Sequence, residues 1–389
     1  MDEHIHSQNL LVHFRRAEEI KAQSLNFKSI ALNNRQLCDL ELLLNRAYYP
    51  LGGYMTQDDY QSVLKTMRLS DSTLWPMPIC LDVGHGVAEK LKPGEKVALR
   101  DGEGFMLAVL TVEEIWQPDL RREAALIFGT DDPKTHPGVQ KFYTNTASFY
   151  LGGLVEGLAL PPHFDYQELR HAPAETQKIL TQRGWRHVAG YQTGAILHCG
   201  QKAAMAHAIK NIGAGILLHA ATDDSLLGSV EHFAKIRCVM RFAETFPKNM
   251  FQLGLLPMHI RKAGPRQALM EALVHKNYGC THFFVAPDHA DPFVNGDGQC
   301  FYPAGEAQAL VARHGEEVNI AMIPLIPTVY VEEKAQYIPE TEVNSAMTVK
   351  GLNSNEFKRR LEFNLDLPEW YTFPGVVEEL RLAFPPRAR

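Results

Sequence analysis

The feature that most constrains this chain is a regular alternation of short apolar segments and amphipathic helices between residues 166 and 328. Five segments have the pattern of strands, at 187–192, 214–221, 250–256, 282–287 and 319–325. Amphipathic stretches such as 228–246 and 264–279 lie between them. Alternation at this spacing predicts an α/β domain in which helices wrap a parallel sheet. Ligands of such sheets bind beyond the carboxyl ends of the strands, so polar residues that follow a strand are the first candidates for a site.

The regions on either side have a different pattern. Residues 1–165 contain β-rich runs at 74–83 and 104–116, and two predicted helices flank the Pro-Leu-Gly-Gly turn at 50–53. Residues 159–166 have the composition of a linker. Near the end of the chain, 353–365 and 374–384 are predicted helices, and Ser354 is a possible N-cap of the first. We therefore predict three domains, at 1–165, 166–328 and 329–389.

Composition excludes several classes of partner. The net charge is -6 over 389 residues and no dense basic run occurs, which argues against nucleic acid. Apolar runs are shorter than the ~18 residues of a membrane span, and the acidic N-terminal segment lacks the apolar core of a signal peptide. Six cysteines lie far apart with no C-x-x-C pair, which argues against a disulfide framework or a thiolate zinc site. We expect a cytoplasmic protein with free thiols and no bound metal.

Two loops that follow predicted strands carry candidate polar groups. The loop 191–201 enters a predicted helix, whose first N–H groups suit phosphate oxygens, and His198 lies near that start. The alternative is that His198 caps the helix or fills a gap. The second loop, 283–293, places Asp288 and His289 at a strand end, where ligands bind in such sheets. The alternative there is an Asx-type turn between two prolines.

A third loop, 260–268, is basic. Arg261, Lys262 and Arg266 cluster around a Gly-Pro helix start. Cations at a helix N-terminus oppose the helix dipole, so an anion or an acidic side chain between them would explain the cluster. The alternative is a solvated basic turn.

Longer segments of the chain closely resemble the ATP sulfurylase (sulfate adenylyltransferase) family. The resemblance runs through "NNRQLCDLELLLNRAYYPLGGYMTQDDYQSVLKTMRLSDSTLWPMPICLDV", "GTDDPKTHPGV" and "YLGGLVEG". It continues through "IRKAGPRQALMEALVHKNYGCTHFFVAPDHADP", "NGDGQCFYPAGEAQAL", "YIPETEV" and "LPEWYTFPGVVEELRLAFPPRAR". It implies a β-rich PUA-like N-terminal domain, a Rossmann-like nucleotidyltransferase domain with a parallel sheet, and a small α/β C-terminal domain.

The resemblance also implies a reaction and its participants. The family joins ATP and sulfate to give adenosine 5′-phosphosulfate and pyrophosphate, with Mg²⁺ accompanying ATP and no tightly bound cofactor. Matching the family motifs assigns catalysis to Thr193 and His198, and nucleotide or substrate binding to Gln192, Asp288, His289 and Ala290. We add Arg261 and Arg266 of the basic loop as substrate-binding candidates. The family implies a homo-oligomer, a dimer or larger.

Two catalytic loops depart from the family. The motif Q-T-R-N-P-x-H-R-A-H reads "QTGAILHCGQ" at 192–201, which places Gly194, Ala195, Ile196, Cys199 and Gln201 at the altered positions. The motif G-R-D-H-A-G reads "APDHAD" at 286–291, with Pro287 in place of arginine. A basic T-K-P-G-D segment is also missing from "ATDDSLLGS" at 221–229.

These losses predict a change in function. In the family the first lost arginine holds sulfate beside the glutamine, and glycine cannot replace its charge-assisted bonds. Loss of one preorganised donor typically costs ~100- to 1000-fold in rate. We therefore expect sulfate activation to be lost or strongly reduced. Three alternatives stay open: an active enzyme in which Arg261 and Arg266 compensate, a non-catalytic nucleotide-binding partner of sulfur-pathway enzymes, and an adenylyltransferase for a larger or less charged acceptor.

Overall fold

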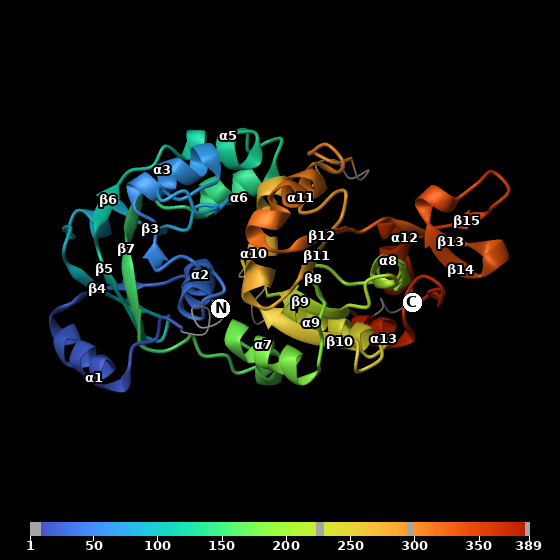
Figure 1. The fold of residues 1–389 in the computed structure, drawn as a ribbon, viewed down its shortest axis with the longest axis horizontal. Helices are drawn as coiled ribbons and strands as arrows, with labels where there is room; N and C mark the ends of the chain where they lie inside the picture. The colour runs from blue at the N-terminus through green and yellow to red at the C-terminus, as the bar shows by residue number, and fades with distance from the viewer. Residues whose placement is uncertain (1–8, 223–228, 294–298, 386–389) are drawn as a thin grey trace.

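The protein has three units that follow one another along its long axis (Figure 1). A computed structural model describes residues 9–222, 229–293 and 299–385. The missing basic segment considered above falls largely on residues 223–228, outside the described residues. In the described parts of the chain, no helix is long and apolar enough to cross a membrane. The six cysteines are free thiols.

The N-terminal unit is built on a seven-stranded sheet with the order β1-β4-β5-β7-β2, and β3 and β6 also pair with β7. Its strands are β1 (Lys28–Ala31), β2 (Gly53–Tyr54), β3 (Leu81–Val83), β4 (Lys96–Arg100), β5 (Met106–Thr111), β6 (Glu114–Trp116) and β7 (Phe149–Gly157). Its helices are α1 (Phe14–Gln23), the 3₁₀ turn η1 (Ser24–Asn26), α2 (Asn34–Leu44), α3 (Gln57–Thr66), α4 (His85–Ala88), α5 (Leu120–Phe128) and α6 (Pro137–Asn145). The predicted β-rich character is confirmed, although only 81–83 of the run 74–83 forms a strand.

Two glycines of β7 allow the close approach on which this sheet depends. A Cβ atom at Gly153 would lie 2.0 Å from the carbonyl oxygen of Thr111, and one at Gly152 would lie 2.2 Å from that of Met55. Gly153 also has a φ of +147°, which side chains rarely adopt. The glycine pair Gly152–Gly153 is therefore required in β7, with which β2, β3, β5 and β6 all pair.

The central unit is the predicted parallel sheet, with the order β10-β9-β8-β11-β12. The strands are β8 (Val188–Thr193), β9 (Gly215–Ala221), β10 (Phe251–Leu256), β11 (His282–Val285) and β12 (Ala321–Pro324), so all five predicted strands are confirmed. The accompanying helices are η2 (Gln167–Leu169), α7 (Pro173–Gln182), α8 (Cys199–Ile209), α9 (Val230–Ala243), α10 (Gly264–Asn277) and α11 (Glu306–Val318).

Helices cover both faces of the central sheet, as the continuous apolar runs of its strands require. On one face, Val188, Leu217 and Phe283 pack with α10 and α11 in a core that continues into the N-terminal unit. On the other face, Ile216 and Leu218 pack with α8 and α9 in a separate core. The first two units are therefore joined by one apolar core, whereas the opposite face of the sheet has its own.

The C-terminal unit contains a three-stranded sheet with the order β14-β13-β15. Its elements are β13 (Thr328–Val331), η3 (Glu332–Lys334), β14 (Gln336–Pro339), η4 (Glu340–Glu342), β15 (Val349–Lys350), α12 (Ser354–Glu362) and α13 (Pro374–Ala383). Both predicted helices are confirmed, but the proposed cap is wrong: Asn353 accepts the N–H of Glu356 at 2.8 Å, and Ser354 is the first helical residue. The proposed boundaries at 165/166 and 328/329 stay predictions.

Arg266, in the first turn of α10, links the central unit to the N-terminal unit. Its guanidinium donates to the carbonyl oxygens of Leu64 (2.8 Å), Val63 (3.2 Å) and Pro76 (3.3 Å). Burial lowers the pKa of Arg266 to about 10. Val63 and Leu64 lie in the last turn of α3 and Pro76 lies after it, so the guanidinium donates to acceptors at the end of a helix in the neighbouring unit.

We predict that Arg266→Met destabilises the protein by about 2–4 kcal/mol, because it removes charged hydrogen bonds and leaves buried carbonyls without donors. Chemical denaturation of the purified protein measures the change. Arg313→Met, at an exposed position of α11, is the matched control and should change the unfolding free energy by less than about 0.5 kcal/mol. Equal stabilities of the two variants would show that the interdomain bonds contribute nothing.

Candidate functional site

A cavity of about 770 Å³ lies between the carboxyl edge of the central sheet and the N-terminal unit. The order of the sheet reverses between β8 and β11, because the chain proceeds from β8 to β10 on one side and from β11 to β12 on the other. Parallel sheets bind ligands at such a reversal. The end of β8 and the loops after β10 and β11 line the cavity from one side, and residues of β3, α5 and α6 line it from the other.

The structure brings together most of the residues proposed from the sequence, but not all. Those that line the cavity are Gln192, Thr193, Gly194, Ala195, Arg261, Asp288, His289 and Ala290. The residues His198, Cys199, Gln201, Arg266 and Pro287 are not among its lining residues. In the altered loop, residues 192–201, the first half therefore lines the cavity and the second half does not.

The first half of this loop forms a tight turn without charge. The Thr193 hydroxyl donates to the carbonyl oxygen of Ala195 at 3.0 Å and accepts the Ala195 N–H at 3.1 Å. A Cβ atom at Gly194 would lie 2.7 Å from the Cδ1 atom of Ile260, so any side chain at 194 requires that isoleucine to move. Ile196 turns away and packs with Cys238, Val376 and Leu380. Apolar contacts thus occupy space beside the turn.

His198 is the N-cap of α8. Its Nδ1 atom accepts the N–H of Gly200 at 3.1 Å, and its own N–H donates to the Gln201 Oε1 atom at 2.8 Å. The ring stacks on Tyr371 with a centroid distance of 5.0 Å. Burial lowers the pKa of His198 to about 4, so the ring is neutral near pH 7. This geometry fits the alternative in which His198 caps the helix. It gives no support to the catalytic role of His198, which stays a prediction.

The start of α8 is closed to a phosphate by the C-terminal unit. The N–H of Cys199 donates to the carbonyl oxygen of Tyr371 at 3.0 Å, while His198 takes the next N–H. The Thr328 hydroxyl donates to the carbonyl oxygen of Gly200 at 2.9 Å. Burial raises the pKa of the Cys199 thiol to about 11, so it does not supply a thiolate near neutral pH. The start of α8 is therefore a point of contact between the central unit and the C-terminal unit.

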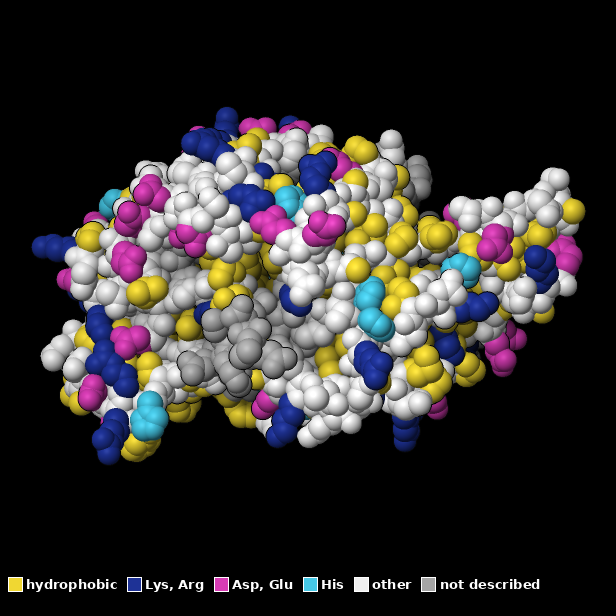
Figure 2. Space-filling view, viewed as in Figure 1, with side chains coloured by type: hydrophobic (Ala, Val, Ile, Leu, Met, Phe, Trp, Pro, Cys, Tyr) yellow, Lys and Arg dark blue, Asp and Glu magenta, His cyan; other side chains and the backbone are white. Residues whose placement is uncertain are grey.

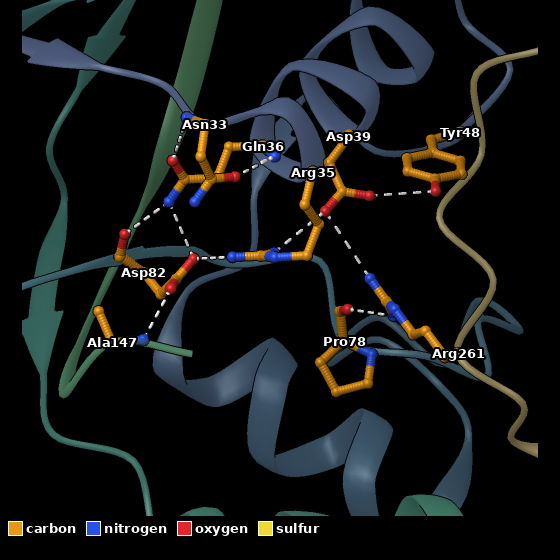
Figure 3. Close-up of polar contacts among 9 residues, drawn as sticks. All are labelled: Asn33, Arg35, Gln36, Asp39, Tyr48, Pro78, Asp82, Ala147 and Arg261. Carbon is orange, nitrogen blue, oxygen red and sulfur yellow. Dashed lines mark hydrogen bonds and ion pairs between the residues drawn. The ribbon is translucent and has the colours of Figure 1, made fainter. Parts of the chain in front are cut away.

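Both arginines that line the cavity are held by the N-terminal unit (Figure 3). Arg35 is paired with Asp82 and lies 3.5 Å from Asp39. The Arg261 guanidinium donates to the carbonyl oxygen of Pro78 at 3.0 Å and lies 3.8 Å from Asp39.

Asp39 and Asp82, which pair with these arginines, also accept hydrogen bonds from other groups. Both are nearly buried, with 2% and 4% of their side chains exposed at Asp39 and Asp82. Asp82 also accepts from the Gln36 amide (3.0 Å) and the Ala147 N–H (2.8 Å), and Asp39 accepts from the Tyr48 hydroxyl (3.2 Å). The acidic partner that the sequence pattern suggested for Arg261 is therefore Asp39.

The loop after β11 presents a histidine with a carboxylate partner. His289 Nε2 lies 2.7 Å from the Glu271 Oε2 atom, and 8% and 4% of the two side chains are exposed. The Gln267 amide donates to the Glu271 Oε1 atom at 2.6 Å, and Gln267 in turn accepts the Ala263 N–H at 3.2 Å. Sequence reasoning missed Glu271. The signal was a glutamate four residues after Gln267 on an otherwise apolar helix face.

The neighbours of His289 hold the loop in shape. Ala290 has a left-handed backbone with a φ of 55°, and its carbonyl oxygen accepts the N–H of Gly264 at 3.2 Å. Asp291 accepts the N–H groups of Phe293, Phe301 and Tyr302. Asp288 is exposed into the cavity. Of these residues, only Asp288 and His289 offer side-chain polar atoms to a ligand.

Gln192 contributes a buried acceptor. Its side chain is only 7% exposed, and its Nε2 atom lies 3.6 Å from the Met258 sulfur. Its Oε1 atom is buried without a hydrogen-bond partner. A buried oxygen without a donor is costly, so this amide is held in place by packing rather than by its own hydrogen bonds.

The cavity has little net charge. Its basic residues are Arg35, Lys141, Arg261 and Lys262, and its acidic residues are Asp82, Glu123, Glu271, Asp288 and Asp291. Burial raises the pKa of Glu123 to about 7. Across the face in Figure 2, basic and acidic side chains are interspersed. Within the described residues, no group of three or more His, Cys, Asp or Glu side chains is placed to hold a metal ion.

Comparisons with known proteins agree with this architecture. The sequence profile of the ATP-sulfurylase family matches residues 167–383, and that of a PUA-like domain matches residues 4–160. The chain is 37% identical to a sulfate adenylyltransferase of Neosartorya fischeri, over 96% of this chain and 65% of that protein. It is 35% identical to a sulfate adenylyltransferase of Schizosaccharomyces pombe, over 95% of this chain and 76% of that protein.

A solved structure is also similar over most of the chain. A hexameric APS kinase from Thiobacillus denitrificans superposes with a TM-score of 0.80 and 32% sequence identity, covering 97% of this chain and 67% of that one. The chain thus spans about two thirds of the length of several proteins that it matches, such as 65% of the Neosartorya protein.

We predict that protonation of His198 destabilises the fold. Since its folded pKa lies near 4, below the ordinary value of 6.5, the unfolded state binds the proton more readily between these values. The stabilisation is complete above about pH 6.5 and declines, by on the order of 2 kcal/mol, as the pH falls to about 4. His198→Asn, which still caps but does not titrate, should lose less stability over this range in denaturation measurements. His207→Asn, an exposed position of the same helix, should follow the parent protein.

Proposed function

Because the chain belongs to the ATP-sulfurylase family, we propose that it binds an adenine nucleotide in this cavity but activates sulfate very weakly or not at all. The family reaction brings a sulfate dianion against the α-phosphate of ATP, so a productive site has to offset negative charge on both reactants. The observation that carries the proposal is that Arg35 and Arg261 are both engaged by the N-terminal unit. If Arg35 turned to sulfate, the buried Asp82 would lose its ion-pair partner, and if Arg261 did so, the Pro78 carbonyl oxygen would lose its donor.

The altered loop supports the same conclusion. At the position where the family holds sulfate, Gly194 offers no side chain and Ile260 lies beside it. Arg266, the second arginine that might have compensated, bonds to backbone carbonyls outside the cavity lining. The reading in which Arg261 and Arg266 replace the lost arginines therefore has no support from their contacts.

Nucleotide binding is supported by what remains. The cavity lies at the reversal of the parallel sheet, and Gln192, Thr193, Asp288, His289 and Ala290 still line it. Its volume of about 770 Å³ falls within the range of small-molecule sites. In this proposal Mg²⁺ arrives with ATP as part of the substrate. Asp288 is the exposed carboxylate of the cavity lining, and Mg²⁺ prefers carboxylate oxygens as protein ligands.

Self-association is a separate part of the proposal. The solved structural neighbour is described as a hexamer. We propose that this chain also forms a homo-oligomer, a dimer or larger. Sedimentation velocity at micromolar concentration decides this, since a monomer would contradict it.

We predict that the purified protein releases pyrophosphate from MgATP at the same rate with and without sulfate. A variant that restores the family motifs should gain sulfate-dependent release. It carries Gly194→Arg, Ala195→Asn, Cys199→Arg, Gln201→His and Pro287→Arg, with Ile260→Ala to make room beside residue 194. Restoring preorganised donors should raise the rate at least ~100-fold over background.

Two controls accompany this assay. Ile260→Ala alone should stay at background, because it makes space without adding charge. Calorimetric titration with ATP tests the nucleotide site independently, and its expected result is binding by the parent protein. Sulfate-dependent turnover by the parent protein would refute the loss of sulfate activation, whereas a silent titration would refute nucleotide binding.

A further inference from the structure

Glu123, on α5, is a buried carboxylate of the cavity lining that has neither a cation nor a backbone N–H as its partner. Its side chain belongs to a residue that is only 5% exposed. In the same lining, Asp82 is paired with an arginine, Glu271 is paired with a histidine, and Asp291 accepts backbone N–H groups. Glu123 forms no ion pair with any of the described residues, so its charge is the least compensated of the buried charges in the cavity wall.

Two tyrosine hydroxyls hold one oxygen of Glu123 in place. The Tyr60 hydroxyl donates to Oε2 at 2.8 Å, and the Tyr150 hydroxyl donates to the same atom at 3.0 Å. The other oxygen, Oε1, receives no hydrogen bond from the described residues and is not among their buried atoms without a partner. Since Glu123 lines the cavity, Oε1 is the oxygen that can take up a proton from it.

The titratable and charged groups around Glu123 give its carboxylate little compensation. They come from each element packed near it, and they are Tyr60 of α3, Cys80 before β3, Asp82 of β3, Lys141 of α6, Tyr150 of β7 and Arg261 of the loop after β10. Burial raises the pKa of the two tyrosines and of the cysteine, so these three groups are uncharged near neutral pH. Asp82 adds a second negative charge, and the charge of Arg261 is shared with Asp39.

An anionic ligand in the cavity therefore meets a buried carboxylate. A sphere with the volume of the cavity, about 770 Å³, is about 11 Å across, and two charges that far apart in a protein interior change a binding equilibrium by on the order of tenfold. A carboxylate that is repelled in this way holds a proton more tightly.

We infer that an adenine nucleotide that binds in this cavity drives the uptake of a proton by Glu123, so that Glu123 sets the pH dependence of nucleotide affinity. The proton comes from solvent and forms an O–H bond with Oε1, while Oε2 keeps the two tyrosine hydroxyls. The uptake removes the negative charge that opposes the phosphate groups. This inference rests on the proposed nucleotide site.

The direction of the pH dependence follows from linkage. The pKa of Glu123 is about 7 in the free protein and rises when the anion binds, so just above pH 7 the complex holds more protons than the separate partners. Uptake should peak there at about half a proton per ligand, the value expected for a tenfold interaction. The nucleotide should bind ~5- to 10-fold more weakly at about pH 9 than at about pH 6.5.

The test uses the purified full chain and adenosine 5′-phosphosulfate, whose phosphate and sulfate groups keep the same charge over this pH range. Calorimetric titrations in buffers of different ionisation enthalpy measure the protons taken up, and titrations across the range measure the dissociation constant. Glu123→Gln still accepts both tyrosine hydroxyls but does not titrate. It should take up no proton, and its dissociation constant should change less than about twofold over the range.

Two further variants separate the charge of Glu123 from its packing. Tyr60→Phe removes one of the two hydrogen bonds that lower the pKa of Glu123, so the pH of greatest uptake should move upward, a change that a merely structural role would not produce. Glu103→Gln, at an exposed position between β4 and β5, is the matched control and should follow the parent protein.

A parent protein that binds the nucleotide without taking up a proton would overturn the inference. Uptake that persists in Glu123→Gln would also overturn it, because the proton would then belong to another group of the cavity, such as His289. Failure of the parent protein to bind either adenosine 5′-phosphosulfate or ATP would instead overturn the proposed function on which the inference rests.

Discussion

The site depends on one buried network, in which Arg35 and Arg261 share Asp39 while Arg35 also pairs with Asp82. Burying four charges is costly unless every lone pair is satisfied, and here the Tyr48 hydroxyl, the Gln36 amide and a backbone N–H complete the two aspartates. The network fixes the loop after β10 against the N-terminal unit and so shapes one wall of the cavity. In the proposed function, these bonds keep the two guanidiniums from a second polyanion beside ATP.

The second half of the altered loop likewise makes its contacts within the protein. A helix start can hold phosphate only if its N–H groups are free, and in α8 the first two are taken by Tyr371 and His198. Ile196 and Leu197 pack into apolar clusters at the same place. The second half of the loop therefore stabilises the junction with the C-terminal unit, while Gln192 and Thr193 at its start line the cavity.

Much of the fold was predictable because its signals are local. All five strands of the central sheet were found from apolar runs of the right length, and helices α2, α3, α9, α10, α12 and α13 from their periodicity. The site was predictable only in part. Asp288 and His289 were found because they directly follow a strand, whereas Glu271 was missed because a glutamate in the middle of a helix is ordinarily a solvated residue. The cap of α12 was misplaced by one residue, since Asn353 and Ser354 are both good caps.

The sequence by itself determined the family, the parallel sheet and the loss of arginines from two loops, because these are properties of residue type and order. Only the tertiary structure decided what the remaining charges do. Arg261 and Arg266 lie five residues apart in one basic loop, yet one faces the cavity beside Asp39 and the other donates to carbonyls of the N-terminal unit. His198 caps a helix against Tyr371, and His289 meets Glu271. Each outcome depends on a partner far away in the chain, which no local pattern can specify.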